Sequence, residues 1–360
     1  MKLEFIRKKL VEHNSDAYII LNHEGSGQPD SAYVAGFTGS ESVIIITQSE
    51  QYILVDGRYF TRSRQESPDF KMLEANRGRV YEDMGKYFPE MGVNSILVDP
   101  STTFYTSIKM FEKHIPGLKI NTAAGMLHEI RMVKTDDEIA KLQASGDVAC
   151  AAFNQLVTEL KPGMTERAIA GRLEYLMKEM GADKYSFDSI VASGTMGAFP
   201  HYVPSSKEIA VGELVTIDFG AYLDGYASDM TRTIAVGEVS DKLREIYETV
   251  KGSQQAGLDA ANAKMTGIAL DKVCRDYIEE RNYGKYFVHG TGHGLGLDVH
   301  EMPYVNTNNE DLLPVNSVVS IEPGIYIENI GGVRIEDCVV IKEDGHINLN
   351  DKVTKDLITI

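Results

Sequence analysis

The sequence has few cysteines, and none of its apolar runs is long. The three cysteines, Cys150, Cys274 and Cys338, are odd in number and widely spaced, and no CxxC motif occurs. A disulfide framework is therefore not expected, and a reducing cytoplasm is the compartment that fits best. The longest apolar runs, such as 17–21 and 43–46, have the length of strands, whereas a membrane helix needs about 20 apolar residues. The first ten residues lack the apolar stretch of a secretory signal, so we expect neither such a signal nor a membrane helix.

Positive charge is also scarce. The chain has 36 Lys and Arg against 53 Asp and Glu, a formal net charge of −17 and a pI near 5.0. Affinity for nucleic acid comes from clustered basic side chains, and no basic run is longer than Arg7-Lys8-Lys9. We therefore expect no nucleic-acid partner and no anionic membrane surface as a partner, and we take the acidity to serve solubility.

The length of 360 residues suits two domains. Residues 1–125 alternate between short apolar runs and helical periodicity such as that of Val80–Phe88. Continuous apolar runs are typical of strands that are covered on both faces. The sequence thus predicts an α/β domain over 1–125, followed by a linker over 126–133, with strands at Ala17–Leu21, Ser42–Thr47, Gln51–Val55 and Ser95–Val98.

A capping signal marks the start of a second domain, which we place at 134–360. Thr135 and Glu138 have the spacing of a capping box, in which each side chain binds the other residue's backbone amide. A helix is predicted from there to Leu160, where Pro162-Gly163 ends it. Thr165 caps a second helix that extends to about Met180.

Two similar strand pairs follow. The first comprises Glu213–Phe219 and Tyr226–Ile234, with Asp224-Gly225 as a two-residue turn. The second comprises 317–326 and 332–341, with Gly331-Gly332 as its turn signal. Each pair begins with isoleucine, a carboxylate, any residue and glycine, and each has a further carboxylate on its return strand. We expect two pseudo-symmetric hairpins that face each other across a site, with helices between them near 241–263 and 270–281.

Chemistry-bearing side chains gather in this second domain. The stretch 288–301 holds three histidines and four glycines, and carboxylates lie on either side of it. Taken singly, each has a structural explanation, because a strand aspartate or a loop histidine is often only a satisfied polar residue. Together they are candidate ligands for two divalent cations, since carboxylates suit Mn²⁺ and an imidazole also suits Co²⁺, Fe²⁺ or Zn²⁺. The candidates are Asp218, Asp229, His293, Glu322 and Glu336.

The glycines of the histidine stretch are expected to let the backbone approach a ligand closely. Gly290, Gly292, Gly294 and Gly296 alternate with other residues. The third glycine of a dinucleotide fingerprint is absent, and no lysine opens a helix after them, so they do not form a phosphate-binding loop.

These residues resemble the pita-bread metallopeptidases, the family of methionine aminopeptidase, aminopeptidase P and prolidase. The resemblance extends over about 134–360. The preceding part, including Val55-Asp-Gly-Arg-Tyr59, looks like the α/β domain that precedes the catalytic domain in the proline-specific members. The resemblance implies an α/β N-terminal domain, an α+β pita-bread (creatinase/aminopeptidase) catalytic domain, a peptide substrate and a homodimer.

The same resemblance implies roles for single residues. Asp218 would bind one metal ion, Asp229 and Glu336 would bridge two, and His293 and Glu322 would complete the second site, with manganese first and cobalt, zinc or iron as other choices. Glu322 would also move the proton during catalysis. The other positions that match the family are two substrate-facing histidines, His201 and His300, and two residues beside the ligands, His289 and Arg334. Arg334 lies two residues before Glu336 and is expected to hold a ligand carboxylate.

One departure from the family pattern bears on specificity. Archaeal-type prolidases have an arginine four residues after the second substrate-facing histidine, where it meets the terminal carboxylate of a dipeptide. Here Tyr304 follows His300 at that distance. We therefore expect an Xaa-Pro aminopeptidase, with a prolidase as the alternative if another cation such as Arg58 takes that place. A methionine-type or broader aminopeptidase, a metal-free creatinase-like hydrolase and a binding protein without activity rank lower, the last two because all five ligands are present.

Overall fold

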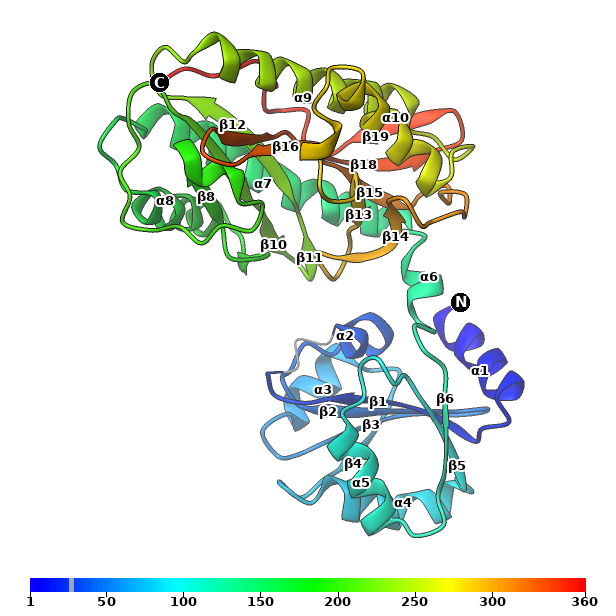
Figure 1. Ribbon diagram of the computed structural model, residues 1–360. Helices are drawn as coiled ribbons and strands as arrows, with labels where there is room; N and C mark the ends of the chain where they lie inside the picture. Colours follow the sequence, from blue (N-terminus) through cyan, green and yellow to red (C-terminus); the bar gives the residue numbers. More distant parts are fainter. Residues whose placement is uncertain (26–28) are drawn as a thin grey trace. The chain divides into compact units, whose positions relative to one another are not determined.

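The chain forms two units, Met1–Ile130 and Arg131–Ile360, and the computed structural model describes residues 1–25 and 29–360 (Figure 1). The division falls inside the segment 126–133 that the sequence analysis assigned to a linker, and the short helix α6 (His128–Arg131) occupies part of that segment. Among the described residues, no helix is long and apolar enough to cross a membrane.

A six-stranded mixed sheet forms the first unit. Its order is β4-β3-β2-β1-β5-β6, and all four predicted strands occur in it as β1, β2, β3 and β5. The edge strands β4 and β6 were not predicted, because only their central residues are partly buried and their apolar signal is short. The strands are β1 Ala17–Asn22, β2 Ser42–Thr47, β3 Gln51–Val55, β4 Lys71–Glu74, β5 Ser95–Val98 and β6 Lys119–Thr122, and the helices are α1 Lys2–Glu12, α2 Asp30–Ala35, α3 Phe60–Glu66, α4 Val80–Met91 and α5 Tyr105–His114.

The second unit opens with the two predicted helices. In α7 (Asp136–Glu159) the Thr135 side chain accepts from the Glu138 amide, and Glu138 accepts from the Thr135 amide, so the capping box is confirmed. In α8 (Glu166–Glu179) the Thr165 hydroxyl accepts from the Ala168 amide, as the second cap requires. The remaining helices are α9 Asp241–Ala260 and α10 Gly267–Glu279, with 3-10 turns η1 Gly194–Ala198 and η2 Gly284–Tyr286.

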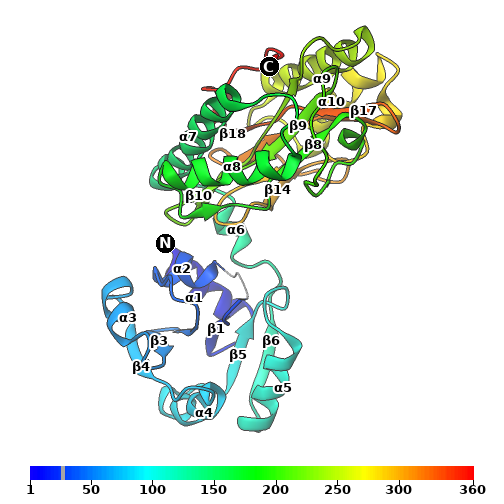
Figure 2. The ribbon, with the colours of Figure 1, turned by 90° about the vertical axis from the view of Figure 1, so that its left-hand side faces the viewer.

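Small sheets lie between these helix pairs. One apolar core joins α7 and α8 to β8, β9 and β12, and a second joins α9 and α10 to β15–β18. Figures 1 and 2 show the helix pairs apart, with strands between them. The sheet orders are β12-β9-β8, β14-β13-β15-β18-β19, β16-β17 and β11-β10-β7. The strands are β7 Lys184–Tyr185, β8 Ile190–Ser193, β9 Leu214–Phe219, β10 Ala221–Leu223, β11 Tyr226–Ala227, β12 Met230–Ala235, β13 Gly292–Gly294, β14 Glu301–Val305, β15 Val318–Ile321, β16 Gly324–Ile327, β17 Gly331–Arg334, β18 Asp337–Lys342 and β19 Gly345–Asn348.

One of the two predicted turns is confirmed and the other is wrong. Asp224 and Gly225 both have positive φ, 49° and 85°, and connect β10 to β11. Gly331 and Gly332 instead begin β17, and the turn before them lies at 328–330. The glycines are needed for close packing, because a Cβ on Gly332 would lie 2.1 Å from the carbonyl oxygen of Gly197 in η1.

This contact gives a test of the packing. Gly332→Ala should destabilise the protein by about 1–3 kcal/mol, because backbone atoms must move to admit the methyl group. Gly345→Ala is the matched control, since a Cβ there meets nothing within 4 Å, and its effect should stay within about 0.5 kcal/mol. Thermal unfolding of both variants measures the difference. Equal melting temperatures would show that the approach of Gly332 to Gly197 leaves room for a methyl group.

Candidate functional site

A cavity of about 500 Å³ lies in the second unit. It is lined by every residue that the sequence analysis named as a ligand, a catalytic residue or a neighbour of the ligands. They come from segments spread over more than a hundred residues, and the fold brings all of them together. These residues are His201, Asp218, Asp229, His289, His293, His300, Glu322, Arg334 and Glu336.

Strand register brings the carboxylates together. Asp218 in β9 lies opposite Thr231 in β12, and Asp229 lies two residues before Thr231, on the same face of the strand. In the other hairpin Glu322 follows β15 and Glu336 precedes β18. The Glu336 amide donates to the Thr231 carbonyl at 3.1 Å. The two predicted hairpins are thus joined directly at the site.

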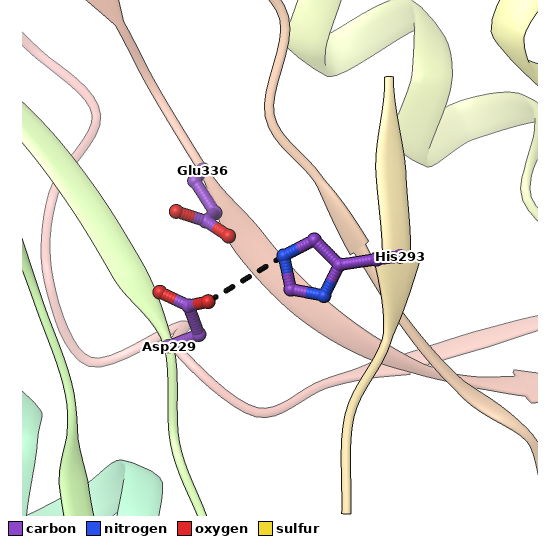
Figure 3. Close-up of side chains that lie close together, drawn as sticks. All are labelled: Asp229, His293 and Glu336. Atoms are coloured by element: carbon purple, nitrogen blue, oxygen red, sulfur yellow. Dashed lines mark ion pairs between the residues drawn. The ribbon is translucent and has the colours of Figure 1, made fainter. Parts of the chain in front are cut away.

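Three buried side chains point toward one another at the centre of this cavity (Figure 3). Asp229, His293 and Glu336 are 4%, 8% and 1% exposed, and one ligand atom from each lies within 4.8 Å of the others. The His293 Nε2 atom lies 3.6 Å from an Asp229 oxygen and 3.2 Å from Glu322 Oε1. Its Nδ1 lies 3.1 Å from the Gly294 carbonyl oxygen. That contact holds a proton on Nδ1 and directs Nε2 toward the carboxylates, as a metal-binding histidine requires.

The glycines beside His293 have a structural role that the sequence analysis did not foresee. A Cβ on Gly292 would lie 1.9 Å from the Ser320 carbonyl oxygen, and one on Gly294 would lie 2.4 Å from that of Met302. At these two positions the space is taken by the neighbouring strands. The close approach that was expected for a ligand thus serves here to hold β13 between β14 and β15.

The carboxylates perturb one another strongly. Burial, with the charges of Glu336 and Asp218, raises the pKa of Asp229 well above its ordinary value. Burial and the charges of Glu322 and Asp218 do the same to the pKa of Glu336. Burial also acts on Glu322, but the hydrogen bond and charge of His293 outweigh it and hold the Glu322 pKa at about 2. The negative charge of this cluster is therefore only partly compensated by the protein.

Several carboxylate oxygens lack a partner, which fits bound cations. Asp218 Oδ1, Asp229 Oδ1 and Glu336 Oε1 are buried and have no hydrogen-bond partner among the described residues. An unpartnered buried polar atom is costly. Divalent cations would satisfy these oxygens and favour the ionised carboxylates, so this donor set fits such ions.

Arg334 holds the carboxylate of Asp218, one of the candidate ligands. Its Nη2 donates to Asp218 Oδ2 at 2.7 Å, its Nη1 to the Tyr326 hydroxyl at 2.7 Å and its Nε to the Thr231 hydroxyl at 3.1 Å. It also lies 3.4 Å from the Pro200 carbonyl oxygen. Although burial acts against the charged form, the surrounding negative groups raise the Arg334 pKa well above its usual range. The guanidinium is therefore charged, and each of its three nitrogen atoms already donates a hydrogen bond.

Three hydroxyl residues of the site were not predicted. Thr231 donates to Glu336 at 2.7 Å, Ser320 donates to Glu322 at 3.1 Å, and the Tyr326 hydroxyl lies 2.8 Å from His289 Nε2. Their positions in the sequence contained a usable signal, because Thr231 follows Asp229 by two residues and Ser320 precedes Glu322 by two. Such spacing places both side chains on one face of a strand.

The two histidines that were predicted to face the substrate are exposed in the cavity. His201 follows η1, and His300 directly precedes β14. The ring of His300 lies 4.1 Å from that of His293, centroid to centroid. Burial, followed by the charge of His293, lowers the His300 pKa. His300 is therefore neutral at pH 7 and keeps one N–H to donate.

Known proteins resemble the chain along nearly its whole length. The model of metallopeptidase family M24 matches residues 140–343, and that of the creatinase/prolidase N-terminal domain matches residues 2–133. An Xaa-Pro dipeptidase of Pyrococcus furiosus is 41% identical over 96% of each chain. Among solved structures, an Xaa-Pro dipeptidase from Bacillus anthracis (TM-score 0.94, 38% identity, 100% of this chain and 99% of that one) is similar. So is an X-Pro aminopeptidase from Thermotoga maritima (TM-score 0.92, 35% identity, 99% of this chain and 100% of that one).

These likenesses confirm the predicted family and the predicted fold class, an α/β N-terminal domain followed by a pita-bread domain. The cavity with its four candidate ligand carboxylates lies inside the segment that the first family model matches. The chain therefore belongs to metallopeptidase family M24.

Proposed function

We propose that this protein removes the N-terminal residue from peptides that have proline at the second position. The observation that carries the proposal is the group of four carboxylates and one imidazole around a single cavity, with three buried oxygens that have no partner among the described residues. Relatives named Xaa-Pro dipeptidase and putative Xaa-Pro aminopeptidase, 41% and 35% identical, support the preference for proline.

The five ligands would hold two divalent cations, with manganese as the first choice and cobalt, zinc or iron as alternatives. Asp229 and Glu336, the pair with raised pKa values, are the proposed bridging residues, Asp218 belongs to one site, and His293 and Glu322 belong to the other. Such cations would acidify a water molecule so that a nucleophile is available near neutral pH.

Three side chains would perform the remaining steps. Glu322, which lines the cavity beside His293, would accept the proton of the attacking water and deliver it to the leaving nitrogen. Neutral His300 can donate its N–H to the carbonyl oxygen as negative charge develops there. His201, exposed in the same cavity, would position the peptide.

The charges of the cavity favour an aminopeptidase over a dipeptidase. A dipeptide presents its terminal carboxylate close to the cleaved bond, and a cation is the natural partner for it. Among the described residues that line the cavity, Arg334 is the only lysine or arginine, and its guanidinium is bound to Asp218 and Tyr326. Arg58 is bound to Asp56 and Glu41 within the first unit. Tyr304, which lines the cavity, is neutral, so longer peptides suit the site better.

The proposal also includes a cytoplasmic location and a homodimer. The three cysteines are all buried and free, as a reducing compartment allows. The dimer rests on the family resemblance.

The first prediction concerns metal and substrate length. Protein stripped by a chelator should lose all peptidase activity and regain it with Mn²⁺ or Co²⁺. The reconstituted protein should cleave Ala-Pro-Ala much faster than Ala-Pro, with Ala-Ala-Ala and Met-Ala-Ala as controls, and released alanine or methionine is the readout. Full activity without metal would refute the proposed chemistry. Cleavage of Ala-Pro alone would establish a dipeptidase instead.

A second prediction concerns the lack of a free positively charged side chain for the dipeptide carboxylate. Tyr304→Arg should raise the rate ratio of Ala-Pro to Ala-Pro-Ala by about threefold, because an ion pair with the dipeptide carboxylate is worth roughly 0.5–1 kcal/mol at a partly exposed site. Tyr304→Met, which is similar in length and neutral, is the control and should leave that ratio unchanged. If both variants change the ratio equally, charge at this position does not set substrate length.

A third prediction needs no activity assay. Since the pKa values of Asp229 and Glu336 are raised in the folded protein, their contribution to stability is present below their unfolded pKa values of about 4 and is lost as the pH rises through the raised values. Metal-free protein should therefore melt at a lower temperature at pH 8 than at pH 5, and Mn²⁺ should remove that difference.

The variant Asp229→Asn tests whether the ionised Asp229 carboxylate causes both the loss of stability at high pH and the stabilisation by Mn²⁺. In metal-free protein at pH 8 it should raise the melting temperature by roughly 3–6 °C, because it removes a buried, repelled charge. The same variant should show little stabilisation by Mn²⁺. Exposed Asp351→Asn is the control and should change neither quantity. An Asp229→Asn variant that Mn²⁺ stabilises as strongly as the unaltered protein would remove Asp229 from the ligand set.

A further inference from the structure

The loop that carries His201 is closed at its base by one buried carboxylate. The chain leaves β8 at Ser193, passes through η1 and His201, and returns at Ser205. Glu166, the first residue of α8, is 0% exposed. Its Oε1 accepts from the Ser193 amide at 2.9 Å and the Ser193 hydroxyl at 2.7 Å. Its Oε2 accepts from the Ser205 amide at 3.1 Å and the Ser205 hydroxyl at 2.8 Å. Each oxygen thus holds one end of the loop.

The start of α8 strengthens this closure. The Glu166 amide donates to the Lys207 carbonyl at 2.9 Å, and the Arg167 amide donates to the Ser205 carbonyl at 3.0 Å. The amino end of a helix also favours negative charge. Burial opposes ionisation of Glu166, but the hydrogen bonds from Ser193 and Ser205 outweigh it and lower the Glu166 pKa. The carboxylate is therefore charged, fully hydrogen-bonded and fixed.

Between its ends the loop lies against the metal-binding hairpin. The Gly197 carbonyl faces Gly332 so closely that a Cβ on Gly332 would lie 2.1 Å from it. Arg334, which binds Asp218, lies 3.4 Å from the Pro200 carbonyl oxygen. His201 follows Pro200 directly and lines the cavity. The loop is thus fixed at both ends and next to His201, and the imidazole projects from a rigid support.

We propose that Glu166 is the residue that positions His201 for the peptide substrate. The inference rests on the proposed function, in which His201 contacts the peptide. Glu166 does not line the cavity and is completely buried, so it acts only through the loop. Glutamine has the same shape, but its amide nitrogen cannot accept a hydrogen bond, so Glu166→Gln leaves the donors of one serine without a partner.

A double-mutant cycle tests the inference. Glu166→Gln, His201→Ala and the double variant are assayed with Mn²⁺ and Ala-Pro-Ala. Glu166→Gln should lower kcat/KM by about tenfold or more, and the double variant should be no worse than His201→Ala alone. Ser193→Ala, which removes one of the four hydrogen bonds to Glu166 and leaves the Lys207 ammonium bound to Glu213, is a milder second variant and should show a smaller loss. Effects of Glu166→Gln and His201→Ala that multiply would overturn the inference.

Glu138→Gln is the matched control for loss of stability. Glu138 is also a largely buried glutamate in the first turn of a helix, but it binds Thr135 and Tyr226 and does not touch the loop. This variant should melt at a lower temperature while kcat/KM stays within about twofold of the unaltered value. A tenfold loss in this control as well would mean that general destabilisation explains the result.

Hydrogen–deuterium exchange provides a readout that does not depend on activity. The Ser193 and Ser205 amides donate to Glu166, so peptides over 193–205 should exchange at least about tenfold faster in Glu166→Gln and unchanged in Glu138→Gln. Unchanged exchange would overturn the inference even in an active enzyme. If the unaltered protein shows no metal-dependent cleavage, the proposed function fails, while faster exchange would still support the closure of the loop by Glu166. A fully active His201→Ala variant would overturn the inference and leave the proposed function intact.

Discussion

The mutual repulsion of four buried carboxylates is the constraint on which the second unit depends. Asp218, Asp229, Glu322 and Glu336 share one cavity, and the charged side chain that faces them is Arg334. Burial and the neighbouring carboxylates raise the pKa values of Asp229 and Glu336, so their charged forms are disfavoured while the cluster lacks a counter-charge. Two divalent cations would carry the positive charge that the four carboxylates require. The repulsion therefore lowers the stability of the unit, and bound divalent cations would restore it.

The architecture around the cluster keeps this repelled group in place. Two hairpins each contribute two carboxylates, and a backbone hydrogen bond from Glu336 to Thr231 joins them. Arg334 reaches across the junction to Asp218 and to the carbonyl of Pro200, which belongs to a third segment. Apolar cores on either side hold the strands against the helix pairs. The polar centre is thus fixed by elements that gain their own stability from apolar burial.

Much of this could be predicted from the sequence, for identifiable reasons. Helix starts have local signals, so Thr135 and Thr165 located α7 and α8 closely. The sequence analysis chose its site residues from the ligand types and their flanking residues, and every one of them lines the cavity. The glycine pair at 331–332 was misread as a turn, because glycines also occur where strands pack closely: both lie in β17, where a Cβ would approach the backbone of η1, and Gly331 has in addition a φ of 134°. Contacts such as Thr231 with Glu336, or Glu166 with Ser205, depend on register and distance in space, which a single sequence does not contain.

The closure of the His201 loop has a consequence for how specificity can change over time. One carboxylate holds both ends of the loop, and a glycine contact holds its first turn, so neither depends on the side chains of Phe199 and Val203. These two side chains are 54% and 79% exposed and have few packing demands. These two positions can therefore vary while His201 and the ends of the loop keep their places. New peptide preferences can be explored at Phe199 and Val203, by evolution or by library selection, without disturbing the carboxylate cluster.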